Sequence, residues 1–224
     1  MLSVVIPTLD AGDRLGRTLE CLGGSGGLVG EVIVADGGSA DNTVAMAERG
    51  GARVIRSAAG RGAQLAAGAD VANGDWLLFL HADTRPGFGW ADAVRNFVAT
   101  TGADHRAAVF RYALDDEAPA ARRLEAVVRW RCRLLGLPYG DQGLLIGRDF
   151  YQSLGGFGPV PLMEDVDFVR RIGRHRLITL DADAVTSAAR YRRGGYIRRP
   201  ARNALCLGLY FLGLPPHRLL RLYE

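Results

Sequence analysis

Two acidic residues stand directly after apolar runs that have the character of buried strands. Asp83 follows the run 76–80, which is too short for a membrane span and too continuous for a half-exposed strand. Asp36 follows the run 31–35. The carboxyl ends of parallel strands meet at one edge of a sheet, where ligands bind in α/β folds. We therefore expect these two carboxylates to lie close together.

The Asp83 carboxylate is the candidate metal ligand. A negative charge beside an apolar interior costs free energy unless a positive group meets it. Mg²⁺ or Mn²⁺ takes one or two carboxylates together with phosphate and water oxygens. His81 is a candidate second ligand, with a structural histidine as the competing interpretation. For an isolated aspartate a turn cap would be the simpler role; the other acidic motifs of this chain favour the metal.

Asp36 lies in a turn with Gly37 and Gly38, which lets backbone N–H groups approach a ligand. Its carboxylate could accept hydrogen bonds from a nucleotide base or from ribose hydroxyls. An aspartate that only shapes the turn is the alternative.

The pair Glu164-Asp165 precedes a predicted helix that runs to about Arg174. A carboxylate near a helix N-terminus stays ionised at neutral pH, as a general base must, and a helix cap is the competing role. Asp141 and Gln142 lie in a glycine-rich loop, where an acid and an amide could bind hydroxyl groups.

Four arginines are candidates for binding a diphosphate. Arg61 stands between two glycines, and a surface arginine at a helix start is its plainer interpretation. Arg190, Arg192 and Arg193 lie in a segment bounded by glycines that could close over phosphates. A solvated basic face, or contact with anionic lipid, competes with that role.

The first 84 positions predict the strands and helices that would position these residues. Strands are expected at 2–7, 31–35, 53–55 and 76–80, with helices at 13–22, 42–49 and 60–71 between them. This alternation predicts a parallel, right-handed α/β sheet. The second half predicts helices at 90–100 and 119–135 and strands at 107–114, 144–146 and 177–180. An apolar stretch at 204–214 and an amphipathic tail at 218–223 follow.

Composition excludes several classes of protein. The 224 residues are 48% hydrophobic and 23% charged, with net charge +4, and every basic residue except histidine is arginine. Without lysine the chain has no Schiff-base nucleophile and no lysine-bearing phosphate loop. The three cysteines are far apart in the sequence, so we interpret them as buried apolar side chains of a protein in a reducing compartment. We expect neither a signal peptide nor a transmembrane helix.

Several motifs, in order along the chain, resemble those of family-2 glycosyltransferases with the GT-A fold. They are VVIPTL at 4–9, ADGGSADNT at 35–43, GRGAQ at 60–64, FLHADT at 79–84, YGDQG at 139–143, PLMEDVDF at 161–168 and ARYRRGG at 189–195. The likeness is greatest to compact bacterial members that carry HADT in place of a two-aspartate metal motif. It implies a Rossmann-like, mixed but mainly parallel sheet flanked by helices, with a C-terminal amphipathic helical segment.

The resemblance implies an inverting transfer of one sugar from a nucleoside-diphosphate sugar to a hydroxyl acceptor, assisted by Mg²⁺ or Mn²⁺. Asp165 would be the general base, Glu164 would orient a sugar, and Asp83 would hold the metal. Asp141 and Gln142 would line the acceptor side, and Arg190, Arg192 and Arg193 the acceptor or diphosphate side. The nucleotide contacts implied are Pro7, Thr8, Asp10, Asp36, Arg61 and Ala82.

The chain departs from the family pattern at two places. Asp10-Ala11-Gly12 replaces the Asn-Glu or Glu-Glu that is usual after the first strand, so one expected nucleotide contact is either missing or moved to Asp10. His81 stands where relatives carry a first metal-motif aspartate, so metal dependence rests on Asp83. The QxxRW motif of processive relatives is absent.

We expect one GT-A domain at 1–197, with a nucleotide-sugar half at 1–100 and an acceptor half at 101–197, and a helical tail at 198–224. The tail could contact a membrane that carries a lipid-linked acceptor, pack on the core, or form a homodimer contact. We expect a cytoplasmic enzyme, with the inner face of the cell membrane as the alternative location. Nucleic acid is not an expected partner. The alternatives in function are a sugar nucleotidyltransferase and an inactive sugar-nucleotide-binding protein with membrane affinity.

Overall fold

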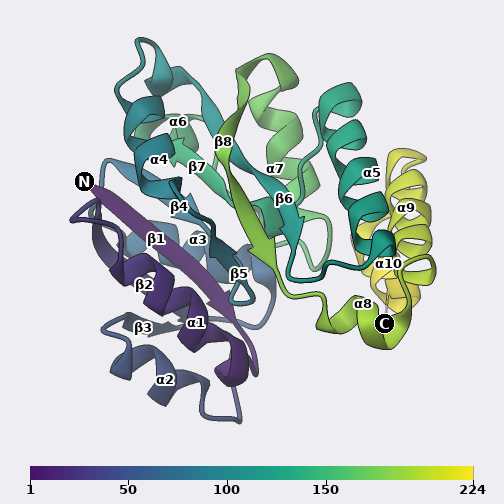
Figure 1. Ribbon diagram of the computed structural model, residues 1–224, viewed down its shortest axis with the longest axis horizontal. Coiled ribbons are helices and arrows are strands. Elements are labelled where there is room, and N and C mark those ends of the chain that lie inside the picture. The colour runs from purple at the N-terminus through teal and green to yellow at the C-terminus, as the bar shows by residue number, and fades with distance from the viewer. Residues whose placement is uncertain (224) are drawn as a thin grey trace.

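The computed structural model describes residues 1–223 and contains an eight-stranded sheet in the order β3-β2-β1-β4-β7-β6-β8-β5 (Figure 1). The strands are β1 (Leu2–Thr8), β2 (Val29–Asp36), β3 (Arg53–Arg56), β4 (Trp76–Phe79), β5 (Thr84–Pro86), β6 (Ala107–Leu114), β7 (Leu144–Gly147) and β8 (Leu177–Thr186).

The first half of the sheet is parallel. β1 pairs with both β2 and β4, and β2 pairs with β3, all in parallel register. The second half joins it through β7, which is antiparallel to β4 and to β6, while β8 runs parallel to β6. The prediction of a mixed, mainly parallel sheet is confirmed. In this register Thr8 lies opposite Asp36, so both reach the carboxyl-end edge.

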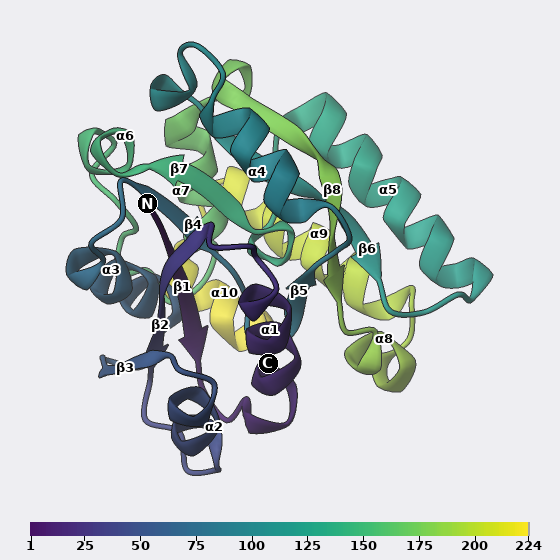
Figure 2. The same ribbon diagram turned by 60° about the vertical axis from the view of Figure 1, so that its left-hand side comes forward.

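Helices cover both faces of the sheet (Figures 1 and 2). They are α1 (Gly12–Gly23), α2 (Thr43–Arg49), α3 (Arg61–Val71), α4 (Trp90–Val98), α5 (Pro119–Leu135), α6 (Arg148–Ser153), α7 (Glu164–Ile172), α8 (Ala189–Gly194), α9 (Arg198–Phe211) and α10 (Pro216–Tyr223).

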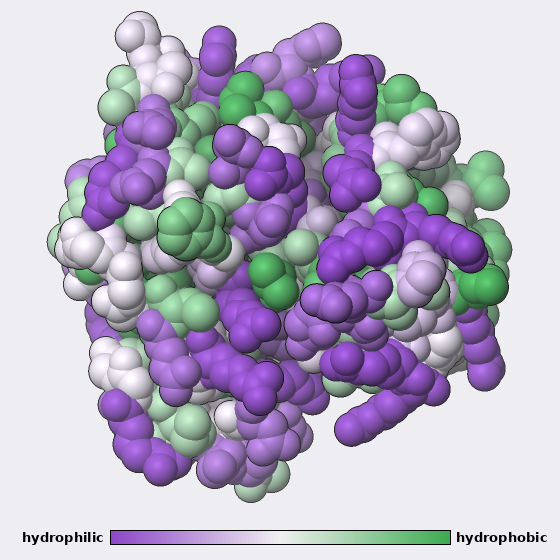
Figure 3. All heavy atoms as spheres, in the orientation of Figure 1, coloured by the Kyte–Doolittle hydropathy of each residue, from purple (hydrophilic) through white to green (hydrophobic). Residues whose placement is uncertain are grey.

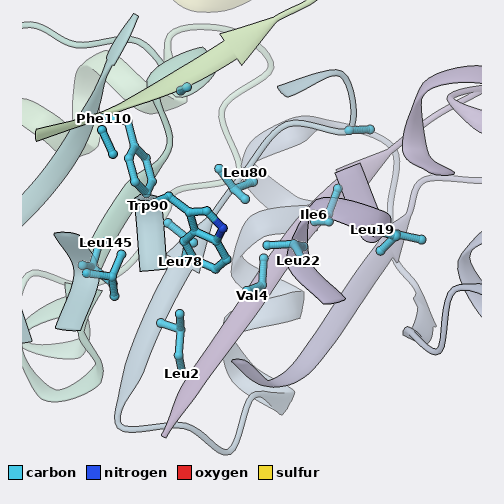
Figure 4. Packing of buried hydrophobic residues seen from close by; sticks show 14 of the residues in the cluster. Leu2, Val4, Ile6, Leu19, Leu22, Leu78, Leu80, Trp90, Phe110 and Leu145 are labelled. Atoms are coloured by element: carbon cyan, nitrogen blue, oxygen red, sulfur yellow. The ribbon is translucent and has the colours of Figure 1, made fainter. Parts of the chain in front are cut away.

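Successive strand residues enter two different cores. On one face Val4, Ile6 and Leu78 pack with leucines of α1 and with Trp90 of α4 (Figure 4). On the other face Val5 packs with α3, α6 and α7. Because β1 and β4 are covered on both faces, their sequences are continuously apolar, not alternating.

The structure extends several predicted elements, β8 and the final helix among them, and adds three short ones. β8 continues to Thr186, six residues beyond the predicted end at Leu180, because Asp181 and Asp183 alternate with the buried Ala182. Both aspartates pair with Arg111 on β6. The final helix begins at Pro216, since proline is compatible with a first helical turn. β5, α6 and α8 were not predicted, because each is very short.

Helices α9 and α10 pack on the sheet assembly through α7. Cys206, Leu207 and Leu219 are buried together with Val166 and Val169 of α7. Of the three roles considered for the tail, packing on the core is therefore observed. No helix within residues 1–223 has the length and apolar composition needed to cross a bilayer.

Candidate active site

Two pockets open at the carboxyl-end edge of the sheet. The β1 pocket, of about 790 Å³, is lined by Pro7, Thr8, Leu9, Ala11, Arg14, Gly60, Arg61, Gln64, His81, Ala82, Asp83 and Arg190. The α7 pocket, of about 840 Å³, is lined by Arg61, His81, Asp83, Tyr139, Gly140, Asp141, Leu162, Met163, Glu164, Asp165, Thr186, Ser187, Arg190, Tyr191, Arg199 and Asn203. Both volumes include space open to solvent.

Four residues belong to both pockets and form the wall between them: Arg61, His81, Asp83 and Arg190. Three different parts of the fold supply them, the start of α3, the loop after β4, and α8. Two cationic side chains and one carboxylate thus stand between the two pockets. We call this set the shared wall.

The Asp83 carboxylate lies between two guanidinium groups without direct hydrogen bonds to them. Its Oδ2 is 3.7 Å from Arg14 and 3.9 Å from Arg190, beyond normal hydrogen-bond length. The side chain is 14% exposed and faces both pockets. No cluster of three or more His, Cys, Asp or Glu side chains suited to a metal occurs within residues 1–223. One accessible carboxylate fits Mg²⁺ or Mn²⁺ that takes its remaining oxygens from substrate and water.

His81 contributes a neutral imidazole to the shared wall. Burial and the charges of Arg61 and Arg190 hold its pKa well below the ordinary histidine value. Its Nε2 is buried and has no hydrogen-bond partner among the described residues. Gly140 lies directly against it, because a Cβ at position 140 would be 2.5 Å from Nε2. Glycine is thus required there for close approach.

Glu164, the first residue of α7, is 2% exposed and forms an ion pair with Arg61 at 3.0 Å. Burial and the neighbouring Asp165 raise the pKa of Glu164, and Arg61 opposes this shift. The preceding residue, Met163, has a left-handed backbone with φ of 66°, an unusual conformation for a non-glycine residue. The chain is therefore turned sharply where α7 begins, and both acidic side chains reach the α7 pocket.

Asp165 is held by backbone donors. Its Oδ2 accepts a hydrogen bond of 2.8 Å from the N–H of Gly140, and its Oδ1 accepts one from the N–H of Val166. The carboxylate lines the α7 pocket beside Tyr139 and Asp141. Both oxygens of the carboxylate are thus oriented by backbone N–H groups.

Asp141 lies in the same pocket and behaves differently. Burial raises its pKa to about 6; Arg131 opposes the shift, and Asp165 and Asp83 reinforce it. Its Oδ1 is buried without a hydrogen-bond partner among the described residues. Two neighbouring carboxyl groups therefore differ in their surroundings, a common arrangement at sites of proton transfer.

Comparison with known proteins identifies the family. The family model described as glycosyl transferase family 2 matches residues 3–154, more than half of the chain. The chain belongs to this family. It is a glycosyltransferase.

Solved structures agree in fold. A mycobacterial protein is 26% identical with a TM-score of 0.58; the match covers 84% of this chain but only 65% of that protein. Glucosyl-3-phosphoglycerate synthase from Mycobacterium tuberculosis, in complex with uridine diphosphate, is 24% identical with a TM-score of 0.64, covering 96% of this chain and 81% of that one. The same synthase in complex with Mn²⁺ and uridine-diphosphate-glucose is 23% identical with a TM-score of 0.63. That match covers 96% of this chain and 80% of the synthase. A search among curated proteins finds no match.

The glycosyltransferase brings most of the predicted site residues to these pockets. Pro7, Thr8, Arg61 and Ala82 line the β1 pocket. Asp83 and Arg190 lie in the shared wall, and Glu164, Asp165 and Asp141 line the α7 pocket.

Five predicted residues do not line either pocket. Asp36 is buried and accepts hydrogen bonds from Thr8, Gly38 and Ser39. Burial raises its pKa, but these hydrogen bonds outweigh it and the net pKa is below the ordinary value. Asp36 meets the β1 pocket only through Thr8.

The other four are engaged elsewhere or exposed. The Asp10 carboxylate accepts from the backbone N–H of Ala40. Buried Gln142 donates to the Phe110 carbonyl. Arg192 pairs with Asp115 and Asp116, and Arg193 is exposed.

Sequence reasoning did not single out eight polar pocket residues: Arg14, Gln64, Tyr139, Thr186, Ser187, Tyr191, Arg199 and Asn203. Gln64 donates to the backbone carbonyls of Thr8 and Ala35 and so ties α3 to the strand ends. Arg199 and Asn203 are four residues apart on α9 and therefore share a face. This spacing was the available signal that both side chains reach the same pocket.

Proposed function

We propose that the chain transfers one sugar from a nucleoside-diphosphate sugar to a hydroxyl acceptor, with inversion at the anomeric carbon. The observation that carries this proposal is the shared wall. It places Arg61, Arg190 and Asp83 between a pocket on the nucleotide side of the fold and a pocket that contains Asp165. A sugar diphosphate bound across this wall would present its anomeric carbon to the α7 pocket.

The β1 pocket is the proposed donor site. Pro7, Thr8 and Ala82 supply its floor, and Asp36 acts there by positioning Thr8, with Asp10 holding the adjoining turn. The donor half at 1–100 and the acceptor half at 101–197 meet at the shared wall. Structural neighbours in complex with uridine diphosphate or with uridine-diphosphate-glucose support this class of donor.

Arg61 and Arg190 face the negative charge that develops on the departing diphosphate. Fixed cationic groups at that position stabilise the transition state more than the ground state. Asp83 is the residue that would hold Mg²⁺ or Mn²⁺, and a bound cation would neutralise diphosphate charge at the same place. Neighbour structures with Mn²⁺ or with Mg²⁺ and uridine diphosphate support this cofactor.

Asp165 is the proposed general base. Its carboxylate takes the proton of the acceptor hydroxyl while that oxygen attacks the anomeric carbon. The bond from the anomeric carbon to the diphosphate oxygen breaks, and the electron pair leaves with the diphosphate. No covalent enzyme intermediate forms. Glu164 holds Arg61 in place at 3.0 Å, and Asp141, Arg199 and Asn203 supply polar groups to the acceptor.

Calorimetric titration with a panel of nucleoside diphosphates, with and without Mn²⁺, tests the donor site. We expect one nucleotide to bind in a metal-dependent way and the metal dependence to be lost in Asp83→Ala. Binding that does not depend on the metal would indicate that Arg61 and Arg190 bind the diphosphate without a cation. Absence of binding to every member of the panel would refute the proposed function.

A further inference from the structure

Helix α9 presents an apolar face to solvent. Positions 201, 204, 205, 208, 211 and 212 repeat at intervals of three and four, and all are exposed. They are Ala201, Ala204, Leu205, Gly208, Phe211 and Leu212. Leu212, the residue that ends the helix, is 84% exposed, and Leu205 is 57% exposed. A surface helix that packs on a core normally turns polar residues outward, so this face lacks the expected polarity.

The opposite face of α9 is already in use. Cys206 and Leu207 are buried against α7, and Arg199 and Asn203 line the α7 pocket. Of the outer face, Phe211 contacts Arg170 of α7, whereas Leu205 and Leu212 stay largely exposed. One helix walls the acceptor side of the site and simultaneously offers an unpartnered apolar surface.

The sequence of this helix and of its flanks is rich in arginine, although Arg192 is paired with Asp115 and Asp116. Between Ala184 and Tyr223 the sequence has no aspartate or glutamate and eight arginines, at positions 190, 192, 193, 198, 199, 202, 218 and 221. Arg192, Arg193, Arg198 and Arg218 are exposed. In Figure 3 the end of the molecule that holds α8, α9 and α10 shows hydrophilic side chains beside hydrophobic ones.

Two partners could cover the apolar face, a second copy of the chain or a lipid surface, and the charge favours the lipid surface. A second copy of the chain would bring two arginine-rich segments together, and like charges oppose such an association. An anionic lipid surface would meet both the apolar face and the arginines. A helix of 14 residues is also too short to span a bilayer and suits the interface plane.

We propose that the outer face of α9 docks on an anionic lipid surface, so that the α7 pocket receives a hydroxyl acceptor carried in that surface. Delivery of the acceptor from the lipid surface rests on the proposed transferase function, whereas the docking itself does not. Because the inner face of α9 forms part of the pocket, adsorption places the acceptor side of the site beside the lipid headgroups.

Sedimentation with vesicles tests the docking. The full chain is mixed with vesicles of phosphatidylcholine alone or with added phosphatidylglycerol. We expect binding to the anionic vesicles only, weakened by salt because exposed arginine charges are screened. In Leu205→Asp/Leu212→Asp the affinity should fall by about tenfold for each leucine.

Phe88→Asp is the matched control, since Phe88 is a fully exposed apolar residue in the loop before α4. It should bind vesicles like the unaltered chain, and thermal melts should show that all variants fold. Equal binding to both vesicle types, or undiminished binding of the double variant, would overturn the docking. A dimer in light scattering that the double variant makes monomeric would assign the face to self-association instead.

Nucleotide titration of the same preparations separates the two proposals. Failure of the unaltered chain to bind anionic vesicles, with nucleotide binding intact, would overturn the lipid inference alone. Vesicle binding without binding of any nucleoside diphosphate would refute the transferase function and leave the docking standing.

Discussion

The Arg61 guanidinium lies 3.0 Å from the Glu164 carboxylate and joins the first residue of α3 to the first residue of α7. These residues are 103 positions apart. The ion pair fixes the start of the helix that carries Asp165 against the nucleotide half of the fold. The relative position of the proposed base and the proposed donor site therefore rests on this charged contact together with the apolar packing of α3 and α7 in one core.

Arg61→Met should destabilise the fold by about 1–2 kcal/mol, because it leaves the buried Glu164 without its counter-charge. The loss is smaller than for a fully buried pair, since Arg61 is 38% exposed. Chemical denaturation measures it. The pKa of Glu164 is already raised, so the variant should recover stability as pH falls and the carboxyl protonates. Arg61→Met/Glu164→Gln should be more stable than the single variant; strictly additive losses would contradict the pairing.

Asp165→Asn should lower the rate of transfer by roughly 10²–10⁴, the usual contribution of a general base. Nucleotide affinity should stay unchanged, because Asp165 does not line the β1 pocket. Asp167→Asn is the control on the same helix, where Asp167 pairs with Arg171. Turnover by the Asp165 variant at the rate of the unaltered chain would remove Asp165 from the mechanism.

Arg190→Ala should weaken binding of the nucleoside diphosphate by roughly tenfold or more, as expected for loss of a charge-assisted contact. Arg192→Ala removes the same charge two residues along the same helix, but its partners are Asp115 and Asp116. We expect no change in nucleotide affinity for this control. Equal effects of the two substitutions in calorimetry would indicate a general charge effect in place of a specific contact.

Asp141→Asn should stabilise the ligand-free protein at neutral pH by up to about 3 kcal/mol. The folded-state pKa is about 6, above the unfolded value of 3.8, so the folded state binds the proton more tightly. Stability of the unaltered chain should therefore fall as pH rises from about 4 to about 6. Thermal melts across this range test the sign, and the gain in the variant should vanish at the acidic end. A gain that is independent of pH would show that Asp141 is not the titrating group.

The parallel half of the fold could be predicted because its local patterns are unambiguous. Residues 76–80 read as a buried strand since β4 is covered on both faces, and Asp83 follows from the direction of that strand. The end of β8 could not be predicted in the same way, because Asp181 and Asp183 are stabilised by Arg111 on another strand. The hydrophobic pattern of one segment does not reveal an ion-pair partner on a different segment.

The site was less predictable wherever distant segments meet. The motifs indicated Arg190 and Arg192 equally, and only the packing of α8 turns one to the shared wall and the other to Asp116. Arg199 and Asn203 enter the pocket because α9 packs on Val166 and Val169 of α7. For Asp36 the turn was predicted, but the ligand-binding role of its side chain was not supported. Its carboxylate accepts hydrogen bonds from Thr8 and from backbone N–H groups of the same turn.

The division of the two pockets along the chain has an evolutionary consequence. Apart from Arg190, the β1 pocket is built before residue 84, whereas α8 and α9 supply one side of the α7 pocket. Substitutions in the last quarter of the chain can reshape the proposed acceptor side while most of the lining of the proposed donor pocket is kept. If the proposed roles hold, the choice of acceptor can diversify among descendants of this chain while the choice of nucleotide is inherited.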